Sequence, residues 1–478
     1  MSPTPKSVKI AIFGWTLVIS LTQKGRGDFH INGDSKPVKV ILVLLDGAGD
    51  RSYEALGWRT PLQAADTPNM DRMAAIGGNG LLHAGKLGEC LPSETAHYLL
   101  WGYPRESFPG RGLLEAVGYG VPFDDADVLV LAHLAGILWE GRVPCLALSR
   151  KAVAQEDIDL ETLYRDLDPF ELNGIRIELH HTGGNDAILV LKGKCSPFIS
   201  DSDPMTIGMP LAMVKPLEES PEPELSAVTA EVLNRYIFYC RGKLSNHPIN
   251  KKRAASELPT ADFLVTQRAG RRSPQKPFEM VWGMRGRLIA SGAIYAGLAS
   301  ELGMKFDFSR DSKDPGNDLR GRIEAALEDN IHGFIHVHTK APDEAGHRGD
   351  PIGKAKILTE LDRGLEPLVK TLEGGGRIIA ALTADHSTPC SPPLIHSGEP
   401  VPLVIAGPTV RRDMVDHFDE LSAANGCLGL LRGNELMLYL LNASDRSSLL
   451  GHRLGGGNRA FFPLDYDPLT ARSPQPVK

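Results

Sequence analysis

The chain has 478 residues, of which 42% are hydrophobic and 23% charged, values that are ordinary for a globular protein of two or three domains. The formal net charge of −7 argues against nucleic acid as a partner, because phosphate backbones bind basic surfaces. The six cysteines form no Cys-x-x-Cys pair, which argues against a thiolate zinc site and favours reduced thiols over a disulfide framework.

Residues 1–37 are predicted to form an N-terminal extension that need not be ordered. Two lysines precede an apolar run at residues 10–21, as in a signal peptide, but no small-x-small cleavage site follows the run. The run is too short to cross a bilayer comfortably, and no other segment resembles a membrane span. We therefore expect a cytoplasmic protein with no membrane partner.

The first strong strand is predicted at residues 38–45, whose sequence VKVILVLL is almost wholly apolar. Such a strand is typical of a parallel sheet that is buried on both faces. Segments 333–338, 377–383 and 401–406 repeat the pattern, and residues 352–372 show helical periodicity. This alternation predicts an α/β sheet with helices on both faces.

Residues 122–277 have a different character. Their predicted strands are shorter and alternate between apolar and polar residues, as at 175–180 and 187–191, and a Pro/Glu-rich stretch at 215–225 indicates a linker or exposed turn. We predict that they form a smaller α+β domain inserted into a core. That core comprises residues 38–121 and 278–453, and residues 454–478 form an irregular tail.

Seven side chains lie at or near the expected strand ends and are able to bind metal ions. A mixed set of carboxylates and imidazoles suits zinc, manganese or iron, and it exceeds what one ion needs. Two ions about 4 Å apart can clamp the attacking and leaving oxygens of a phosphoryl transfer. The set consists of Asp46, Ser93, Asp343, His347, Asp385, His386 and His396.

The spacing within this set supports a common site. Asp343 and His347 are four residues apart, which places both side chains on one face of a helix. Asp385 and His386 are adjacent, so they converge only if the strand ends there, and the following Ser-Thr-Pro favours such an end. Each pattern alone also occurs by chance, and His396 alone could be an ordinary loop histidine.

Ser93 precedes an apolar helical run and has two interpretations. It is well placed to cap the helix, which is a common role for serine. It is equally well placed to be a nucleophile, because a helix N-terminus presents free N–H groups to a phosphate on the serine. Serine is a weak nucleophile at neutral pH, so this role requires a metal ion or a base beside it.

Eight motifs together resemble the archaeal-type 2,3-bisphosphoglycerate-independent phosphoglycerate mutases, which belong to the alkaline phosphatase superfamily. The resemblance extends over residues 38–441. The motifs are LLDGAGD, TPNMDRMAAIG, PSETAH, GRGLLEAVGYG, NHPINKKR, HTKAPDEAGHRGD, TADHSTPC and HSGEPVPLVIAG. The resemblance implies an alkaline-phosphatase-like three-layer sandwich with an inserted smaller α+β domain.

The resemblance also implies an isomerase that interconverts 3-phosphoglycerate and 2-phosphoglycerate through a phosphoserine at Ser93. Two divalent ions would assist, usually Mn²⁺ or Mg²⁺, with Zn²⁺ or Co²⁺ as alternatives. One ion would be held by Asp343, His347 and His396. The other would be held by Asp46, Ser93, Asp385 and His386.

The phosphoglycerate itself would be bound by cationic and polar side chains, because guanidinium and ammonium groups suit carboxylates and phosphates. The candidates are His97, Arg111, Asn250, Arg253, Arg268 and Lys340. Two positions depart from the family pattern. Glu94 stands where the family usually has aspartate, and Ala296 stands where a basic residue is frequent, which leaves the substrate less defined than the metal chemistry.

Two other functions remain open. A metal-dependent phosphohydrolase or phosphomutase acting on another small phosphate ester would use the same metals and Ser93. A non-catalytic relative would have no need to keep seven metal-compatible residues. The sequence does not set the native metal or the oligomeric state.

Overall fold

The computed structural model describes residues 38–167 and 169–447 with their side chains, and outside them only the backbone of two short hairpins. One hairpin pairs β1 (Ser7–Ile12) with β2 (Trp15–Ser20), and the other pairs β17 (Leu450–His452) with β18 (Asn458–Ala460). The rest of the predicted extension and tail lies outside the described residues. Within the described part, no helix is long and apolar enough to cross a membrane.

The larger of two structural units, which we call the core unit, is built on an eight-stranded sheet. Seven of the strands run in one direction, and only β15 is antiparallel to its neighbours. In sheet order the strands are β12 (Lys305–Phe308), β11 (Gly286–Ala290), β13 (Phe334–Thr339), β3 (Lys39–Leu45), β14 (Ile378–Thr383), β15 (Val401–Ala406), β4 (Gly78–His83) and β16 (Gly429–Arg432).

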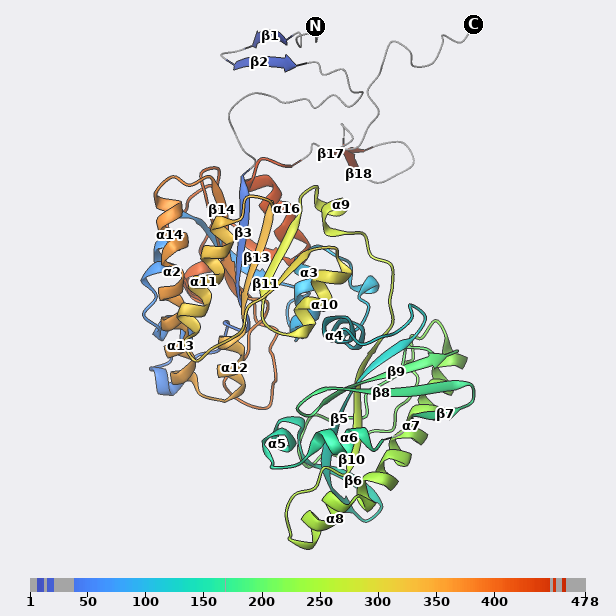
Figure 1. Cartoon of the computed structure of the whole chain (residues 1–478). Coiled ribbons are helices and arrows are strands. Elements are labelled where there is room, and N and C mark those ends of the chain that lie inside the picture. Colours follow the sequence, from blue (N-terminus) through green and yellow to red (C-terminus); the bar gives the residue numbers. More distant parts are fainter. Residues whose placement is uncertain are drawn as a thin grey trace, which may run out of the picture.

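Helices cover both faces of this sheet and give three layers (Figure 1). One face carries α2 (Pro68–Ile76), α11 (Pro315–Glu328), α13 (Pro351–Gly364) and α14 (Glu366–Glu373). The other carries α3 (Ser93–Leu100), α4 (Arg111–Tyr119), α10 (Ala293–Glu301) and α16 (Gly433–Ala443). Shorter helical segments complete the unit: η1 (Glu54–Leu56), α1 (Pro61–Ala64), η2 (Arg105–Ser107), α9 (Phe278–Trp282), α12 (Ala341–His347) and α15 (Glu420–Ala423).

The second, smaller unit contains an antiparallel sheet in the order β10-β5-β9-β8-β7, with β6 paired to β5. The strands are β5 (Val128–Glu140), β6 (Val143–Leu148), β7 (Phe170–Leu172), β8 (Ile175–Gly183), β9 (Asp186–Gly193) and β10 (Phe263–Gly270). Its helices are α5 (Arg150–Gln155), α6 (Leu160–Arg165), α7 (Pro223–Asn246) and α8 (Pro248–Ala255). The smaller unit lies beside the α3, α4 and α10 side of the core unit (Figure 1).

Sequence and structure agree on why the central strands lie in the middle of the sheet. In β3 only Lys39 is partly exposed, and the six apolar residues after it are buried because helices cover both faces. In β14 and β15 all six residues are buried. The predicted α/β sandwich with a smaller α+β unit is therefore confirmed.

This topology brings several chain segments to one edge of the large sheet. Parallel strands β3, β13 and β14 end there, and ligand sites of open α/β sheets lie at such carboxyl ends. Because β15 runs the other way, it begins at this edge. The candidate ligand associated with β15, His396, therefore lies in the loop before the strand. The candidate ligands associated with β3, β13 and β14 lie in the loops after those strands.

Candidate metal and phosphotransfer site

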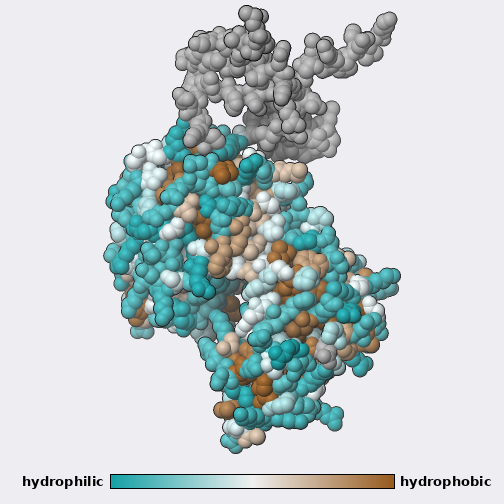
Figure 2. Space-filling model, viewed as in Figure 1, coloured by the Kyte–Doolittle hydropathy of each residue, from teal (hydrophilic) through white to brown (hydrophobic). Residues whose placement is uncertain are grey.

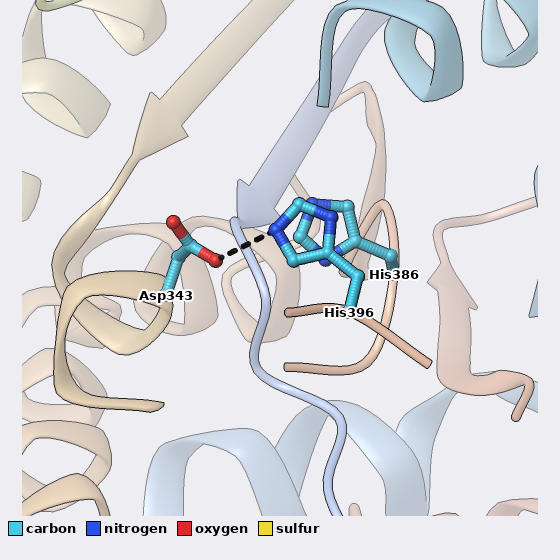
Figure 3. A group of neighbouring side chains, drawn as sticks. All are labelled: Asp343, His386 and His396. Atoms are coloured by element: carbon cyan, nitrogen blue, oxygen red, sulfur yellow. Dashed lines mark ion pairs between the residues drawn. The ribbon is translucent and has the colours of Figure 1, made fainter. Parts of the chain in front are cut away.

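Two groups of side chains at this edge lie close enough to hold a metal ion. In each group one ligand atom per residue lies within 4.8 Å of the others. The first group is Asp343, His386 and His396, and the second is Asp46, Asp385 and His386. Figure 3 shows the first group, with the rings of His386 and His396 stacked and the Asp343 carboxylate facing them.

The backbone after β3 is shaped to permit this convergence. Gly47 has a φ of +64°, and its N–H donates to Asp385 Oδ1 at 3.1 Å. A Cβ at this position would lie 2.4 Å from Thr388 Oγ1 and 2.9 Å from the Asp343 backbone. Only glycine therefore lets the loop after Asp46 pass between the two other ligand-bearing loops.

Hydrogen bonds fix which nitrogen of His386 carries its proton. The Thr388 hydroxyl must donate to the Asp343 carboxylate at 2.8 Å, so its oxygen accepts from His386 Nδ1 at 3.1 Å. The lone pair of His386 therefore lies on Nε2, which is the ligand form of a neutral imidazole. Thr388 was not among the predicted site residues, although its position two residues after His386 is a signal of such support.

The lone pair of His386 faces other acceptors. Its Nε2 lies 3.5 Å from Asp46 Oδ1 and 3.3 Å from Asp385 Oδ2. Neither carboxylate oxygen has a hydrogen-bond partner among the described residues, although both are buried. Buried acceptor atoms that converge without a hydrogen-bond donor are costly unless a cation lies between them. These two carboxylate oxygens and the imidazole nitrogen therefore fit a divalent ion.

The ligands around Asp343 are arranged in a similar way. His396 Nδ1 donates to the Leu91 carbonyl at 2.7 Å, which leaves the lone pair on Nε2, 3.5 Å from Asp343 Oδ1. His347 Nε2 lies 3.3 Å from the same oxygen. The Lys340 ammonium bridges the clusters, at 3.3 Å from Asp46 Oδ2 and 3.1 Å from Asp343 Oδ2.

Burial and charge shift the titration of these groups in different directions. Burial and the nearby Asp46 raise the pKa of Asp385 well above its usual range. For Asp46 burial acts in the same direction, but Lys340 and hydrogen bonding from His338 hold its pKa below its usual range. Burial, with the neighbouring His396, lowers the pKa of His386 to about 3. The imidazole is therefore neutral at physiological pH, as metal binding requires.

Ser93 is the first residue of α3 and lies against this cluster. Its Oγ is 3.1 Å from His386 Nε2, and because that nitrogen carries the lone pair, the hydroxyl donates to it. Pro92 precedes the helix without a side-chain cap, so the first turn presents its N–H groups at Ser93. The structure thus places the serine hydroxyl at a helix N-terminus and beside the nitrogen that a metal ion would use.

A cavity of about 340 Å³ opens beside Ser93, and the molecular surface is hollowed between the two units (Figure 2). Of the residues predicted to bind substrate, Arg111 and Lys340 line it. Arg268 reaches the same region from β10, because it bonds to Glu94, which also lines the cavity. The volume of the cavity suits a small phosphorylated molecule.

The other three residues predicted to bind substrate lie elsewhere. His97 is completely buried behind Ser93, and its Nδ1 donates to the Ser93 carbonyl at 2.8 Å. Asn250 and Arg253 belong to α8, at the far end of the smaller unit (Figure 1). Asn250 bonds to the backbone of Leu244 and Ala261, and Arg253 to Glu156 and two carbonyls. These contacts fasten α8 to its own unit.

Sequence reasoning also missed residues that the structure brings to the cavity. Tyr295 is buried on α10, and its hydroxyl donates to Asp46 Oδ2 at 2.9 Å. Arg310 lines the cavity from the loop after β12 and is exposed. Both depend on how α10 packs against the sheet and on where β12 extends its edge, and no local pattern in the sequence encodes that packing.

Comparison with known proteins agrees with the fold and the donor set. The model of the metalloenzyme superfamily matches residues 38–443. A 2,3-bisphosphoglycerate-independent phosphoglycerate mutase 2 of Methanocaldococcus jannaschii is 38% identical over 90% of this chain and 98% of its own. The corresponding mutase of Methanopyrus kandleri is 36% identical over 86% of this chain and 98% of its own.

Solved structures give the same result. A protein from Pyrococcus horikoshii superposes with a TM-score of 0.68 at 27% identity, covering 87% of this chain and 100% of its own. The cofactor-independent phosphoglycerate mutase of Thermoplasma acidophilum gives 0.56 at 28% identity, with 85% and 100% covered. The fold and the buried donor set thus define a metal-dependent enzyme of the metalloenzyme superfamily. Within it, the chain belongs to the family of 2,3-bisphosphoglycerate-independent phosphoglycerate mutases.

Proposed function

We propose that this protein interconverts 3-phosphoglycerate and 2-phosphoglycerate through a phosphoserine at Ser93. The observation that carries the proposal is the contact of Ser93 Oγ with His386 Nε2, inside a cluster of buried carboxylates and imidazoles. Relatives that the chain covers almost completely are named phosphoglycerate mutases, which supports this activity. The cavity beside Ser93 has room for glycerate while the phosphoryl group resides on the enzyme.

We further propose that the site holds two divalent ions, Mn²⁺ or Mg²⁺, with Zn²⁺ or Co²⁺ as alternatives. Asp343, His347 and His396 would hold one. Asp46, Ser93, Asp385 and His386 would hold the other, and the position of His386 between the two groups supports a shared pocket. When bound, such ions favour the serine alkoxide and offset the negative charge on a transferring phosphoryl group.

The chain's own residues contribute binding, orientation and proton placement. Ser93 Oγ would attack the phosphorus and displace the glycerate oxygen, which takes up the serine's proton, while the helix N-terminus stabilises the phosphoryl oxygens. The other hydroxyl of the glycerate would then attack the phosphoserine, and its proton would return to Ser93 as the P–O bond to the serine breaks. Arg111, Arg268 and Lys340 would hold the phosphate and the carboxylate of the glycerate. We propose that the smaller unit, with the boundaries 122–277, covers the glycerate and keeps water from the phosphoserine.

An assay of the manganese-loaded protein tests the proposal. It should convert 3-phosphoglycerate to 2-phosphoglycerate without added 2,3-bisphosphoglycerate, and Ser93→Ala should abolish the conversion while metal content stays near normal. Release of inorganic phosphate without 2-phosphoglycerate would establish a phosphohydrolase instead. Conversion of a different phosphate ester would establish another phosphomutase. This alternative remains because Glu94 and Ala296 depart from the family pattern.

The location in the cell follows the same proposal. Phosphoglycerates are charged metabolites, and all six cysteines of the chain are free thiols in the structure. We propose the cytoplasm, where thiols stay reduced. Fractionation of cells that produce the full chain tests this location.

A further inference from the structure

Glu94, the residue after the proposed nucleophile, is bonded across the boundary between the two structural units. Its side chain is almost completely buried, with 2% exposed. One carboxylate oxygen accepts from Arg111 Nη1 of the core unit at 3.4 Å, and the other from Arg268 Nη1 of the smaller unit at 3.0 Å. A single carboxylate therefore joins two guanidinium groups from different units beside Ser93.

The smaller unit is locally distorted to present Arg268. The pairing of β10 with β5 shifts register between Gln267 and Gly270, and Arg268 has a φ of +51°, which is unfavourable for a residue with a Cβ. The Arg268 N–H leaves the ladder and donates to Asp201 Oδ1 at 2.6 Å. Strain and bulges of this kind are retained where they aim a side chain at a functional site.

The backbones of the two units also meet at this point. A Cβ on Gly110, which precedes Arg111, would lie 2.6 Å from the Ala269 carbonyl. The Arg271 N–H donates to the Pro109 carbonyl at 3.1 Å. Both guanidinium groups therefore extend from a junction that is tight before any ligand binds.

We propose that Glu94 is a positioning residue whose carboxylate holds Arg111 and Arg268 beside Ser93, so that binding of a phosphate or carboxylate anion depends on this bridge. The inference rests on the proposed function in that the ligand is a phosphorylated anion. Arg111 has a second partner, because its Nε donates to Glu115 at 2.6 Å. The Arg268 guanidinium has Glu94 as its only salt-bridge partner among the described residues, so it depends more on Glu94.

A different role for Glu94, in which it only neutralises the arginines, predicts the opposite change in anion affinity. If Glu94 only offset positive charge, the variant Glu94→Gln would leave two arginines with one fewer anion and would bind anions more tightly. If Glu94 positions Arg268, the same variant releases the guanidinium to solvent and weakens binding. The direction of the change therefore separates the two roles.

The test titrates manganese-loaded protein with inorganic phosphate in a calorimeter. Glu94→Gln should bind phosphate about tenfold or more weakly, since displaced binding groups lose affinity on this scale, and Glu94→Asp should recover part of the loss. Asp201→Asn, which weakens the acceptor of the Arg268 N–H, should act in the same direction. Glu222→Gln is the matched control, because it breaks the Arg271–Glu222 pair of 2.8 Å, three residues along the chain from Arg268.

A double-mutant cycle completes the test. Combined with Arg268→Met, Glu94→Gln should cost little more than Arg268→Met alone, because both changes remove the Arg268–Glu94 contact and Arg111 keeps its bond to Glu115. Tighter phosphate binding by Glu94→Gln, or additive losses in the cycle, would overturn the proposal. Phosphate binding is measured without turnover. A protein that forms no 2-phosphoglycerate would therefore refute the mutase activity, and the calorimetric result would still decide the role of Glu94.

Discussion

Lys354 supports the site from a completely buried position in α13. Its ammonium group donates to the Gly49 carbonyl at 3.0 Å, to Asp50 Oδ2 at 2.9 Å and to the Thr388 carbonyl at 2.8 Å. Gly49 lies on the loop after Asp46, and Thr388 on the loop after His386. We predict that Lys354→Met lowers both stability and metal affinity, because one side chain holds both ligand-bearing loops.

The size of the loss follows from the groups left behind. Removing one member of a buried ion pair costs about 3–5 kcal/mol. Asp50 keeps other donors, because Tyr53 and Cys390 still bond to it, and this places the expected loss near 3 kcal/mol. Adding Asp50→Asn removes the stranded charge and should recover about 1 kcal/mol.

Urea unfolding of the metal-free protein measures this loss. Lys356→Met is the matched control on the same helix, since Lys356 is exposed, and it should change the free energy of unfolding by less than about 0.5 kcal/mol. Titration with Mn²⁺ under conditions where both variants are folded then measures the effect on the site. A Lys354→Met variant as stable as the Lys356→Met control would refute the assigned role of the buried ammonium.

Three further outcomes are expected. Burial raises the pKa of Glu420 to about 7, so between about pH 4 and pH 7 the folded state keeps a proton that the unfolded chain has lost, and stability falls across this range and then levels off. Because the side chain is partly exposed, Glu420→Gln should gain only about 1–2 kcal/mol at pH 8 and nothing at pH 4, and parallel unfolding curves across this range would contradict the shift. Arg253→Met should lower stability by about 1–2 kcal/mol, because it fastens α8, while KM for 3-phosphoglycerate stays within about twofold; a large rise in KM would return Arg253 to the substrate site. Chelation with EDTA should abolish both turnover and calorimetric phosphate binding, and Mn²⁺ should restore them; binding that survives chelation would show that the arginines suffice.

The large sheet and the clustering of the candidate metal ligands were predictable because their signals are local. Buried parallel strands are continuous apolar runs, and each run here ends in a polar loop that carries a candidate ligand. Residues 38–45 and Asp46 form one such pair, and residues 377–383 with Asp385 form another. The position of His396 could not be predicted from such a local signal. It precedes its strand, and only the antiparallel direction of β15 explains why it lies beside residues that follow their strands.

The residues at the proposed substrate cavity were harder to predict because they depend on contacts between units. Asn250 and Arg253 have suitable chemistry, yet α8 lies at the far end of the smaller unit and uses both for its own packing. Arg268 is on a strand whose regular alternation would not place it beside Ser93, and only the bulge in β10 directs it there. Tyr295 reaches Asp46 through helix packing, for which the sequence contains no spacing signal.

Charge explains why the proposed metal ions and the arginines would act together at this site. Lys340 lies between Asp46 and Asp343, and Arg111 and Arg268 share Glu94. These cations are already offset by carboxylates of the chain, whose net charge is −7. A phosphorylated anion therefore gains little from them unless divalent ions supply the missing positive charge. Under the proposed function, the carboxylates that would bind those ions and the carboxylate that would position the arginines have one common effect, because together they let an acidic protein attract an anion beside Ser93.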